Sequence, residues 1–164
     1  MKSSASFSTC KNYRWSLTRH INNSKKELIF IGLNPSLANA TDNDPTIRRL
    51  IGFSENWGYG CLTVLNLFAK VSKSPKSLAS CNDPVGWQND YQLNKMIKYW
   101  SYNDLCELWI GWGINGRLMG RNEKLLKKIK SSSRNPLVIG LTKEGHPKHP
   151  LYISNKKTLF HIDL

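Results

Sequence analysis

Polar side chains follow several apolar runs of the chain, at positions where they could do chemistry. Asn34 directly follows one such run, Asn66 lies near the end of the next, and His146 and His149 follow the last long one. In open α/β sheets, ligands bind beyond the carboxyl ends of the strands. If the runs are parallel strands, we expect the side chains of Asn34, Asn66 and His149 to lie on one cleft.

Each of these side chains also has a purely structural explanation. Asn34 precedes Pro35 and could form a turn. Asn66 stands between Leu65 and Leu67 and could be a buried amide bonded to the main chain. The two histidines could be loop residues flanked by prolines. Their shared position after apolar runs is what favours a functional site.

The elements that must position these side chains follow from the hydrophobic pattern. A strand covered on both faces is predicted over 28–33, and further strands are predicted over 62–68, 105–112 and 137–141. An edge strand is predicted over 158–162, and another strand where Tyr13, Trp15 and Leu17 alternate. Helices are predicted from Asp44-Pro45 to Gly58, from Asp83-Pro84 through Trp100, and over 118–130, and 72–82 reads as a polar loop. Because strands and helices alternate, we expect a three-layer α/β/α fold with a mainly parallel central sheet.

The chain is strongly basic, with 24 Lys and Arg residues against 11 acidic ones and a net charge of +13. Nucleic acid, DNA above all, is the common partner of such an excess, an anionic membrane surface is the rival, and solubility alone is the third explanation. No apolar run is long enough to span a bilayer, so we expect no membrane partner.

The basic residues fall into two groups. Arg48 and Arg49 lie in the first turn of a predicted helix facing the expected cleft, where they could clamp a phosphate or simply be surface charge. A second group lines the predicted helix over 118–130 and its exit, and either a binding stripe or a solvated outer face explains it. Its members are Arg117, Arg121, Lys124, Lys127, Lys128, Lys130 and Arg134.

The four cysteines, Cys10, Cys61, Cys81 and Cys106, contain no Cys-x-x-Cys pair, so we expect no metal and no cofactor. Free thiols in a reducing cytoplasm are the expectation. At 164 residues, the chain should form a single domain over 1–164, with 1–9 disordered, and act as a monomer.

Several ungapped motifs resemble a family of uncharacterised bacterial and phage proteins, the domain of unknown function 1643. They are Gly32-Leu33-Asn34-Pro35-Ser36, Asp44-Pro45-Thr46-Ile47-Arg48-Arg49, Trp57-Gly58-Tyr59-Gly60, Asn66-Leu67-Phe68-Ala69, Asp83-Pro84-Val85-Gly86 and the segment Gly145 to Tyr152. The resemblance runs from about Cys10 to Tyr152 and implies no activity.

The order of these motifs is more distantly similar to the uracil-DNA glycosylase superfamily. That similarity implies that Asn34 places the hydrolytic water, that Asn66 reads the edge of a base, and that His149 contacts the base. It places Gly32, Leu33, Pro35, Ser36 and His146 around the ligand. It also implies that Lys148 and Leu151 meet the nucleic acid, with Leu151 as a wedge into the duplex, because His149-Pro150-Leu151 matches the superfamily's motif better than His146-Pro147-Lys148.

The implied reaction makes chemical sense with these residue types. Breaking an N-glycosidic bond leaves negative charge on the departing base, which a histidine can stabilise by hydrogen bonding. An amide such as Asn66 can donate and accept at once. Asn34 is neutral, so it can orient a water but cannot act as a strong general base.

The superfamily usually carries an aromatic residue shortly after its first motif, stacked on the extruded base. No aromatic residue stands between Pro35 and Phe53. Either another ring, Trp112 or Phe68, supplies the stack, or the pocket does not hold a pyrimidine in the usual way. The leading prediction is therefore an N-glycosylase acting on an uncommon or modified base in DNA. The alternatives are a catalytically silent nucleic-acid-binding module and an enzyme acting on free nucleosides or nucleotides.

Overall fold

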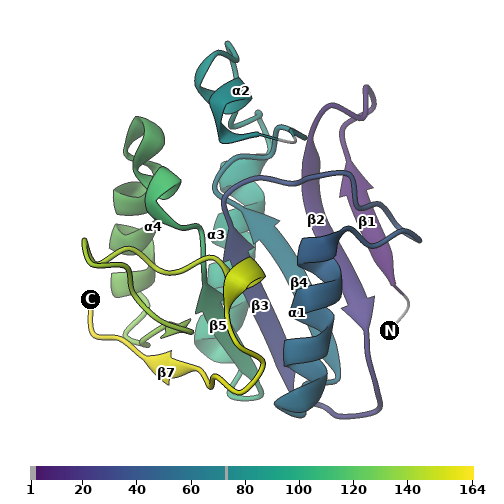
Figure 1. Cartoon of the computed structure of the whole chain (residues 1–164), viewed down its shortest axis with the longest axis vertical. Coiled ribbons are helices and arrows are strands. Elements are labelled where there is room, and N and C mark those ends of the chain that lie inside the picture. Colours follow the sequence, from purple (N-terminus) through teal and green to yellow (C-terminus); the bar gives the residue numbers. More distant parts are fainter. Residues whose placement is uncertain (1–2, 73) are drawn as a thin grey trace.

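The computed structural model describes residues 3–72 and 74–164, which build one seven-stranded sheet with helices on both faces (Figure 1). The strands are β1 (Ser4–Phe7), β2 (Arg14–His20), β3 (Glu27–Gly32), β4 (Cys61–Asn66), β5 (Cys106–Ile110), β6 (Leu137–Val138) and β7 (Phe160–His161). Their order across the sheet is β1-β2-β4-β3-β5-β6-β7. The α/β class predicted from the sequence is therefore confirmed.

The sheet is mixed, so the expectation of a mainly parallel sheet was wrong. Strands β4, β3, β5 and β6 run parallel to one another, whereas β1 with β2, β2 with β4, and β7 with β6 pair antiparallel. The alternation of strands and helices in the sequence predicts only the parallel inner strands, β4, β3, β5 and β6. The antiparallel partners are added by both ends of the chain, and β1 occupies residues 4–7, where we expected disorder.

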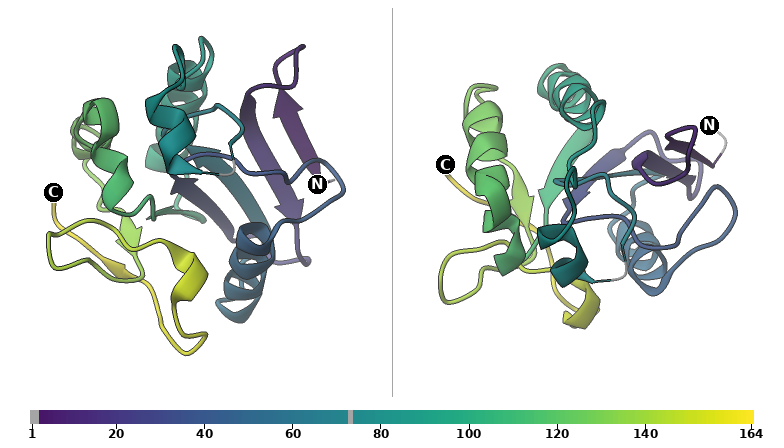
Figure 2. Two further views of the ribbon diagram at one scale, coloured as in Figure 1. Left: turned by 45° about the horizontal axis from the view of Figure 1, so that its top comes forward. Right: turned by 90° about the horizontal axis from the view of Figure 1, so that it is seen from above.

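The helices are α1 (Pro45–Asn56), the short α2 (Pro75–Ala79), α3 (Asn89–Tyr102) and α4 (Arg121–Lys130), with 3-10 turns η1 (Ile114–Gly120) and η2 (Pro150–Tyr152). Figure 2 (right) shows the sheet from above, with α1 on one side and α3 on the other. Strand β3 serves both layers: Leu28 and Phe30 pack with α1, and Ile29 and Ile31 pack with α3 and α4. This is why its apolar run is unbroken.

Helix α1 begins where the sequence predicted. The Asp44 carboxylate accepts the main-chain N–H of Ile47 at 2.8 Å, and Pro45 occupies the first turn, where its missing N–H costs nothing. Ile47, Leu50 and Phe53 then face the sheet at helical spacing. Asp44 is thereby held at the carboxyl end of β3, beside the loop that follows the strand.

Candidate functional site

A small cavity of about 40 Å³ lies at the carboxyl ends of β3 and β4. Asn34, Asn66 and His149 all line it, so the structure brings together the three residues that the sequence placed after separate apolar runs. Gly32, Leu33 and Ser36 also line it, as do Arg14 from β2 and Asp44 at the start of α1.

Asn66 is the last residue of β4 and only 5 % exposed. Its side-chain amide makes no hydrogen bond within the described part of the chain, so it remains available to a ligand. The neighbouring residue on β3 is Gly32. A Cβ at Gly32 would lie 2.9 Å from the Phe30 ring and 3.1 Å from Asn66 Oδ1. Gly32 therefore makes room for both side chains at the cavity.

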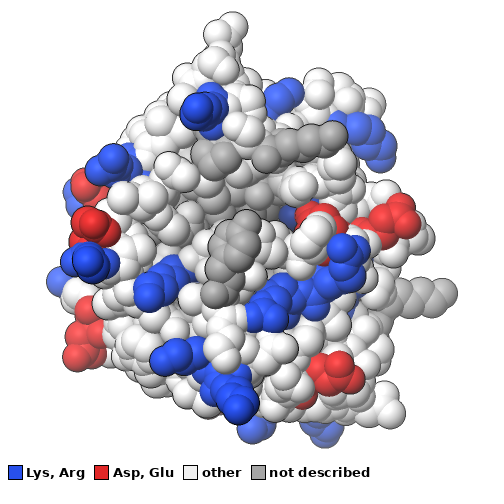
Figure 3. Space-filling view, viewed as in Figure 1, with Lys and Arg blue, Asp and Glu red and all other residues white. Residues whose placement is uncertain are grey.

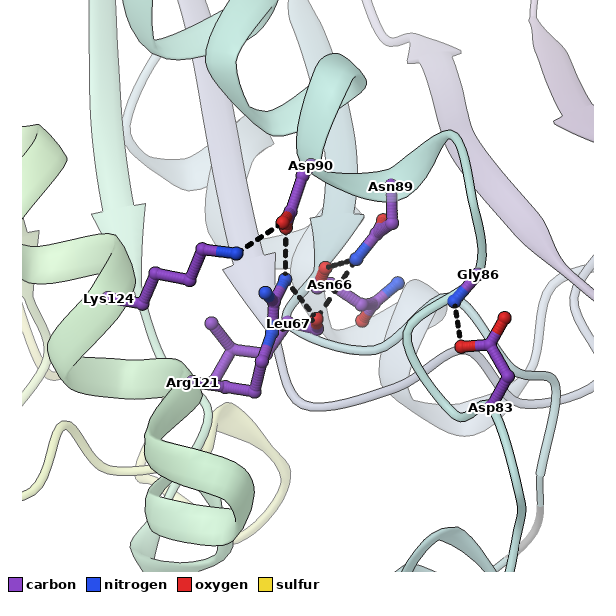
Figure 4. A network of polar contacts seen from close by, with 8 residues as sticks. All are labelled: Asn66, Leu67, Asp83, Gly86, Asn89, Asp90, Arg121 and Lys124. Carbon is purple, nitrogen blue, oxygen red and sulfur yellow. Dashed lines mark hydrogen bonds and ion pairs between the residues drawn. The ribbon is translucent and has the colours of Figure 1, made fainter.

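The Asn66 end of β4 is held in place by a polar network behind it (Figure 4). Asn89 Nδ2 donates to the main-chain oxygens of Asn66 at 3.1 Å and Leu67 at 2.9 Å. The buried guanidinium of Arg121 also donates to Leu67 O, and it bonds the Asp90 carboxylate at 2.7 Å. In Figure 4 no dashed line reaches the Asn66 side chain. Asn89 and Arg121 are thus positioning residues for the strand end.

The hydrogen bond that His149 makes determines which of its two ring nitrogens carries the hydrogen. Its Nδ1 accepts the main-chain N–H of Leu151 at 3.3 Å, which caps η2. Burial lowers the pKa of His149 below the ordinary histidine value, and the negative charge of Asp44 only partly opposes this. A neutral ring with an accepting Nδ1 must carry its hydrogen on Nε2. His149 therefore offers one neutral N–H donor at the cavity.

Asn34 is more constrained than its predicted role required. Its Nδ2 donates to the main-chain oxygens of Ser72 at 2.8 Å and Pro35 at 3.1 Å. The bond to Ser72 fixes the loop after β3 against the segment after β4. Only Oδ1 is left to accept a hydrogen bond from a water or ligand.

Arg14 is a cavity residue that the sequence analysis missed. It is 2 % exposed, its Nη1 donates to Ala38 O at 3.0 Å, and its buried Nε has no hydrogen-bond partner among the described residues. Burial lowers its pKa to about 10, with Asp44 opposing the shift, so it remains charged at neutral pH. A buried donor such as this Nε costs free energy when it has no partner, so its presence in a folded protein requires an explanation.

A β-bulge explains why Arg14 faces the cavity. Ser6 pairs with Ser16 and Phe7 pairs with Arg14, which leaves Trp15 as an extra residue in β2. Arg14 and Arg19 are an odd number of residues apart, yet both guanidinium groups hydrogen bond the loop after β3. Bulges re-aim side chains in this way next to active sites. The sequence shows an alternating strand here and gives no sign of the bulge.

Asp44 is the second missed residue. The sequence identified it only as a helix cap, a role in which Oδ1 is engaged by Ile47 N. Its carboxylate also lines the cavity and acts electrostatically on both Arg14 and His149. Among the described residues, the cavity thus contains one cation, one anion, one neutral N–H donor and one amide with no hydrogen bond.

Other residues proposed from the sequence lie elsewhere. Phe68 and Trp112 are buried in the core cluster with α3 and α4, so neither can supply a ring to the cavity. Among the described residues that line the cavity, the aromatic one is Phe30. His146 and Pro35 do not line it, and Lys148 is exposed.

The two arginines of α1 and Leu151 are close to the cavity without lining it. Arg49 donates to Pro150 O and to Asn155 Oδ1, and its guanidinium lies 4.8 Å from the centre of the Phe53 ring. Arg48 is exposed and donates to Asn43 O. Leu151 is half-buried in η2. Arg49 thus ties α1 to η2, and Arg48 is the freer of the two cations.

Two features of the described residues concern metal ions and membranes. These residues contain no group of three or more His, Cys, Asp or Glu side chains arranged to hold a metal ion. Among their helices, none combines the length and the apolar character needed to cross a bilayer.

Comparison with known proteins finds one family. A family model described as "Protein of unknown function (DUF1643)" matches residues 14–151. The match begins at Arg14 and ends just after His149, so every residue that lines the cavity falls within it. No curated protein and no solved structure matches the chain.

Proposed function

The chain belongs to the DUF1643 family, and we propose that it hydrolyses the N-glycosidic bond of an uncommon or modified base in nucleic acid. The observation that carries the proposal is the meeting of Arg14, Asp44, Asn66 and His149 on one cavity at the carboxyl ends of parallel strands. This is where open α/β sheets bind ligands. The residues also match the charges that such a reaction creates.

In the proposed reaction, water attacks the anomeric carbon, and the carbon–nitrogen bond breaks with its electron pair left on the base. The Arg14 cation and the Nε2–H of His149 stabilise the negative charge on the departing base. The Asp44 carboxylate offsets the positive charge on the sugar and takes the proton that the attacking water loses. Asn34 Oδ1 orients that water, and Asn66 reads the base edge with its free amide.

Asp44 changes the catalytic assignment made from the sequence. A neutral amide such as Asn34 cannot accept a proton effectively, which would leave the reaction slow. A carboxylate at the same cavity supplies the missing base. We therefore assign the acceptor role to Asp44 and leave Asn34 as a positioning residue.

The arrangement of the inner strands agrees with the distant similarity seen in the motifs. Four parallel strands in the order β4-β3-β5-β6, with helices on both faces, fit the three-layer arrangement of the uracil-DNA glycosylase superfamily. In this arrangement Phe30 takes the part of the aromatic ring that contacts the base.

The cavity must open for a base to enter. Its volume of about 40 Å³ holds little more than one water, whose share of liquid volume is about 30 Å³. Ligand pockets are typically several hundred Å³. The loop after β3 and the segment at His149 border the cavity, so their outward movement is the step that we expect to admit a base flipped from its stack.

The direct test is mass spectrometry of the bases released from DNA containing uracil, hypoxanthine, xanthine or hydroxymethyl-pyrimidines. We expect a free base and an abasic site, formed by the wild-type protein and not by Asp44→Asn. If no base is released from any of these substrates while binding to the same DNA persists, the glycosylase proposal fails for them.

A second candidate function is a catalytically silent module that grips nucleic acid. Two observations favour it: the amide nitrogen of Asn34 is committed to main-chain oxygens, and the cavity is closed to a base. This candidate predicts DNA binding that is unchanged by substitutions in the cavity and no base release at any pH.

A further inference from the structure

Helix α3 has an outer face that is unusually aromatic. Its inner face buries Leu93, Ile97 and Trp100 in the core. On the opposite face Tyr91 is 65 % exposed and Tyr102 is 82 % exposed. Such rings normally contribute to a core or an interface, so their exposure on one helix face requires an explanation.

Lysines lie between these rings. Tyr91, Lys95, Lys98 and Tyr102 follow one another at spacings of four, three and four residues, so they share one face of α3. At 1.5 Å per residue, this row extends about 16 Å along the helix. Rings therefore stand at both ends of the row with two positive charges between them.

Two adjoining hollows surround the carboxyl end of this row. One, of about 720 Å³, is lined by Lys95, Tyr99 and Leu105, and the other, of about 470 Å³, by Lys128 of α4 and by Ser131–Ser133. Lys98 and Tyr102 line both hollows, so the hollows meet at these two side chains.

The charge of the two hollows is positive. Their linings contain three lysines, Lys95, Lys98 and Lys128, and one acidic residue, Asp104. Four serines line the second hollow, and the hydroxyls of Ser101, Ser131 and Ser132 donate to main-chain oxygens of their own helices or helix ends. The hydroxyl of Ser133 can donate to a phosphate oxygen. The surface thus combines flat rings with cations and hydrogen-bond donors.

We propose that this surface, the row on α3 with its two hollows, binds single-stranded nucleic acid. Exposed rings stack on bases whose faces are free, as they are in single strands, while lysines neutralise the phosphates between them. Tyr102 is the main stacking ring, and Lys98 is the main phosphate contact. In a duplex the faces of the bases are stacked on one another, so a duplex would gain only the electrostatic attraction between its phosphates and the lysines.

This surface is separate from the cavity. The Tyr99 hydroxyl donates to Glu27, the first residue of β3, whereas the cavity lies beyond Gly32, the last. The carboxyl end of the row therefore lies near the amino end of β3, opposite to the strand end that borders the cavity, and in Figure 1 α3 runs behind the strands. The inference does not depend on base release, because a silent module would use the same surface.

The test measures fluorescence anisotropy with a labelled oligothymidylate over a range of salt concentrations. Tyr102→Ala should weaken binding about tenfold and leave the salt dependence unchanged, because it removes stacking alone. Lys98→Ala should reduce the slope of log affinity against log salt by about 0.7, the value for one phosphate on a single strand. Tyr102→Phe keeps the ring and should bind like the wild type.

Two controls distinguish binding at this surface from a general electrostatic attraction between the basic protein and nucleic acid. Lys156→Ala removes the same charge from an exposed position that lines neither hollow, and it should change the slope less than Lys98→Ala does. Tyr102 is so exposed that its replacement should leave the melting temperature unchanged. Equal binding by Tyr102→Ala and the wild type would overturn the proposal.

Two further results would also overturn it. One is competition by inorganic polyphosphate, which has no bases, as effectively per charge as by unlabelled oligothymidylate. The other is self-association of the wild type, seen by sedimentation and abolished by Tyr102→Ala, which would make the surface a contact between two copies of the chain.

Discussion

His149 lines the cavity with one ring nitrogen already occupied by Leu151 N–H, so its protonation state governs what it can offer a ligand. We predict that His149→Ala slows base release on the order of a hundredfold or more, comparable to the loss of one oxyanion donor. Single-turnover rates measure this. Loss of DNA binding with an unchanged rate of release from the bound complex would contradict the assignment.

The same residue predicts the pH dependence. Because burial lowers its pKa, His149 stays neutral from neutral pH down to below about 6.5, the ordinary histidine value. Protonation at lower pH breaks its Nδ1 bond to Leu151. Base release should therefore be flat near neutrality and fall on acidification, and it should not rise there. A pH–rate profile of the wild type provides the measurement.

We predict that replacing Arg14 abolishes base release without destabilising the fold. Its guanidinium is buried with Nε unpaired, so Arg14→Met exchanges a desolvated cation for an apolar side chain of similar length. Replacing a poorly compensated buried charge in this way often leaves stability unchanged or increases it. We expect a melting temperature within a few degrees of the wild type, together with loss of base release. A large fall in melting temperature would show that Arg14 serves the fold.

The sequence located the cavity only in part. Asn34, Asn66 and His149 could be predicted because each lies at or after the end of an apolar run. The position of a residue relative to such a run can be read directly from the sequence. Arg14 could not be predicted, because a bulge in β2 turns its side chain to the other face. Asp44 was visible as a cap, but its nearness to β2 and to His149 is a property of the folded chain.

At the scale of elements, the end of β4 depends on α3 and α4. Arg121→Ala removes the two guanidinium donors to Leu67 O from a buried position, leaves Asn89 Nδ2 as the remaining donor, and should cost about 1–3 kcal/mol in the free energy of unfolding. Lys124→Ala is the matched control: it breaks an exposed ion pair to the same Asp90 and should cost less than about 1 kcal/mol. Urea denaturation compares them, and equal losses would contradict the role given to Arg121.

Element boundaries differed from the prediction where local chemistry competes with the helix pattern. Asp83-Pro84 was expected to open α3, but the Asp83 carboxylate accepts Gly86 N–H and Gly86 has φ +80°, so a turn forms and the helix starts at Asn89. The predicted helix 118–130 is interrupted at Met119, whose φ is +54°. The expected strand 137–141 shortens to Leu137–Val138.

On the face that contains α1 and η2, the positive charge of the molecule is dispersed. Figure 3 shows Lys and Arg side chains spread over the face that contains α1 and η2, with acidic side chains between them. A net charge of +13 still attracts a polyanion over distances comparable with the Debye length. Affinity for duplex DNA should therefore fall steeply with salt, with a log–log slope near −4 to −5 if about five phosphates are neutralised.

The two arginines of α1 should contribute unequally to that slope. Arg48 is exposed, so Arg48→Ala should reduce the slope by about 0.9, the value for one phosphate on duplex DNA. Arg49 is engaged with Pro150, Asn155 and the Phe53 ring, so Arg49→Ala should lower the melting temperature and leave the slope nearly unchanged. Titrations at several salt concentrations, with melting curves of both variants, separate the two effects. A reduction of about two units in the double variant would mean that both side chains contact phosphate and that Arg49 leaves η2 when DNA binds.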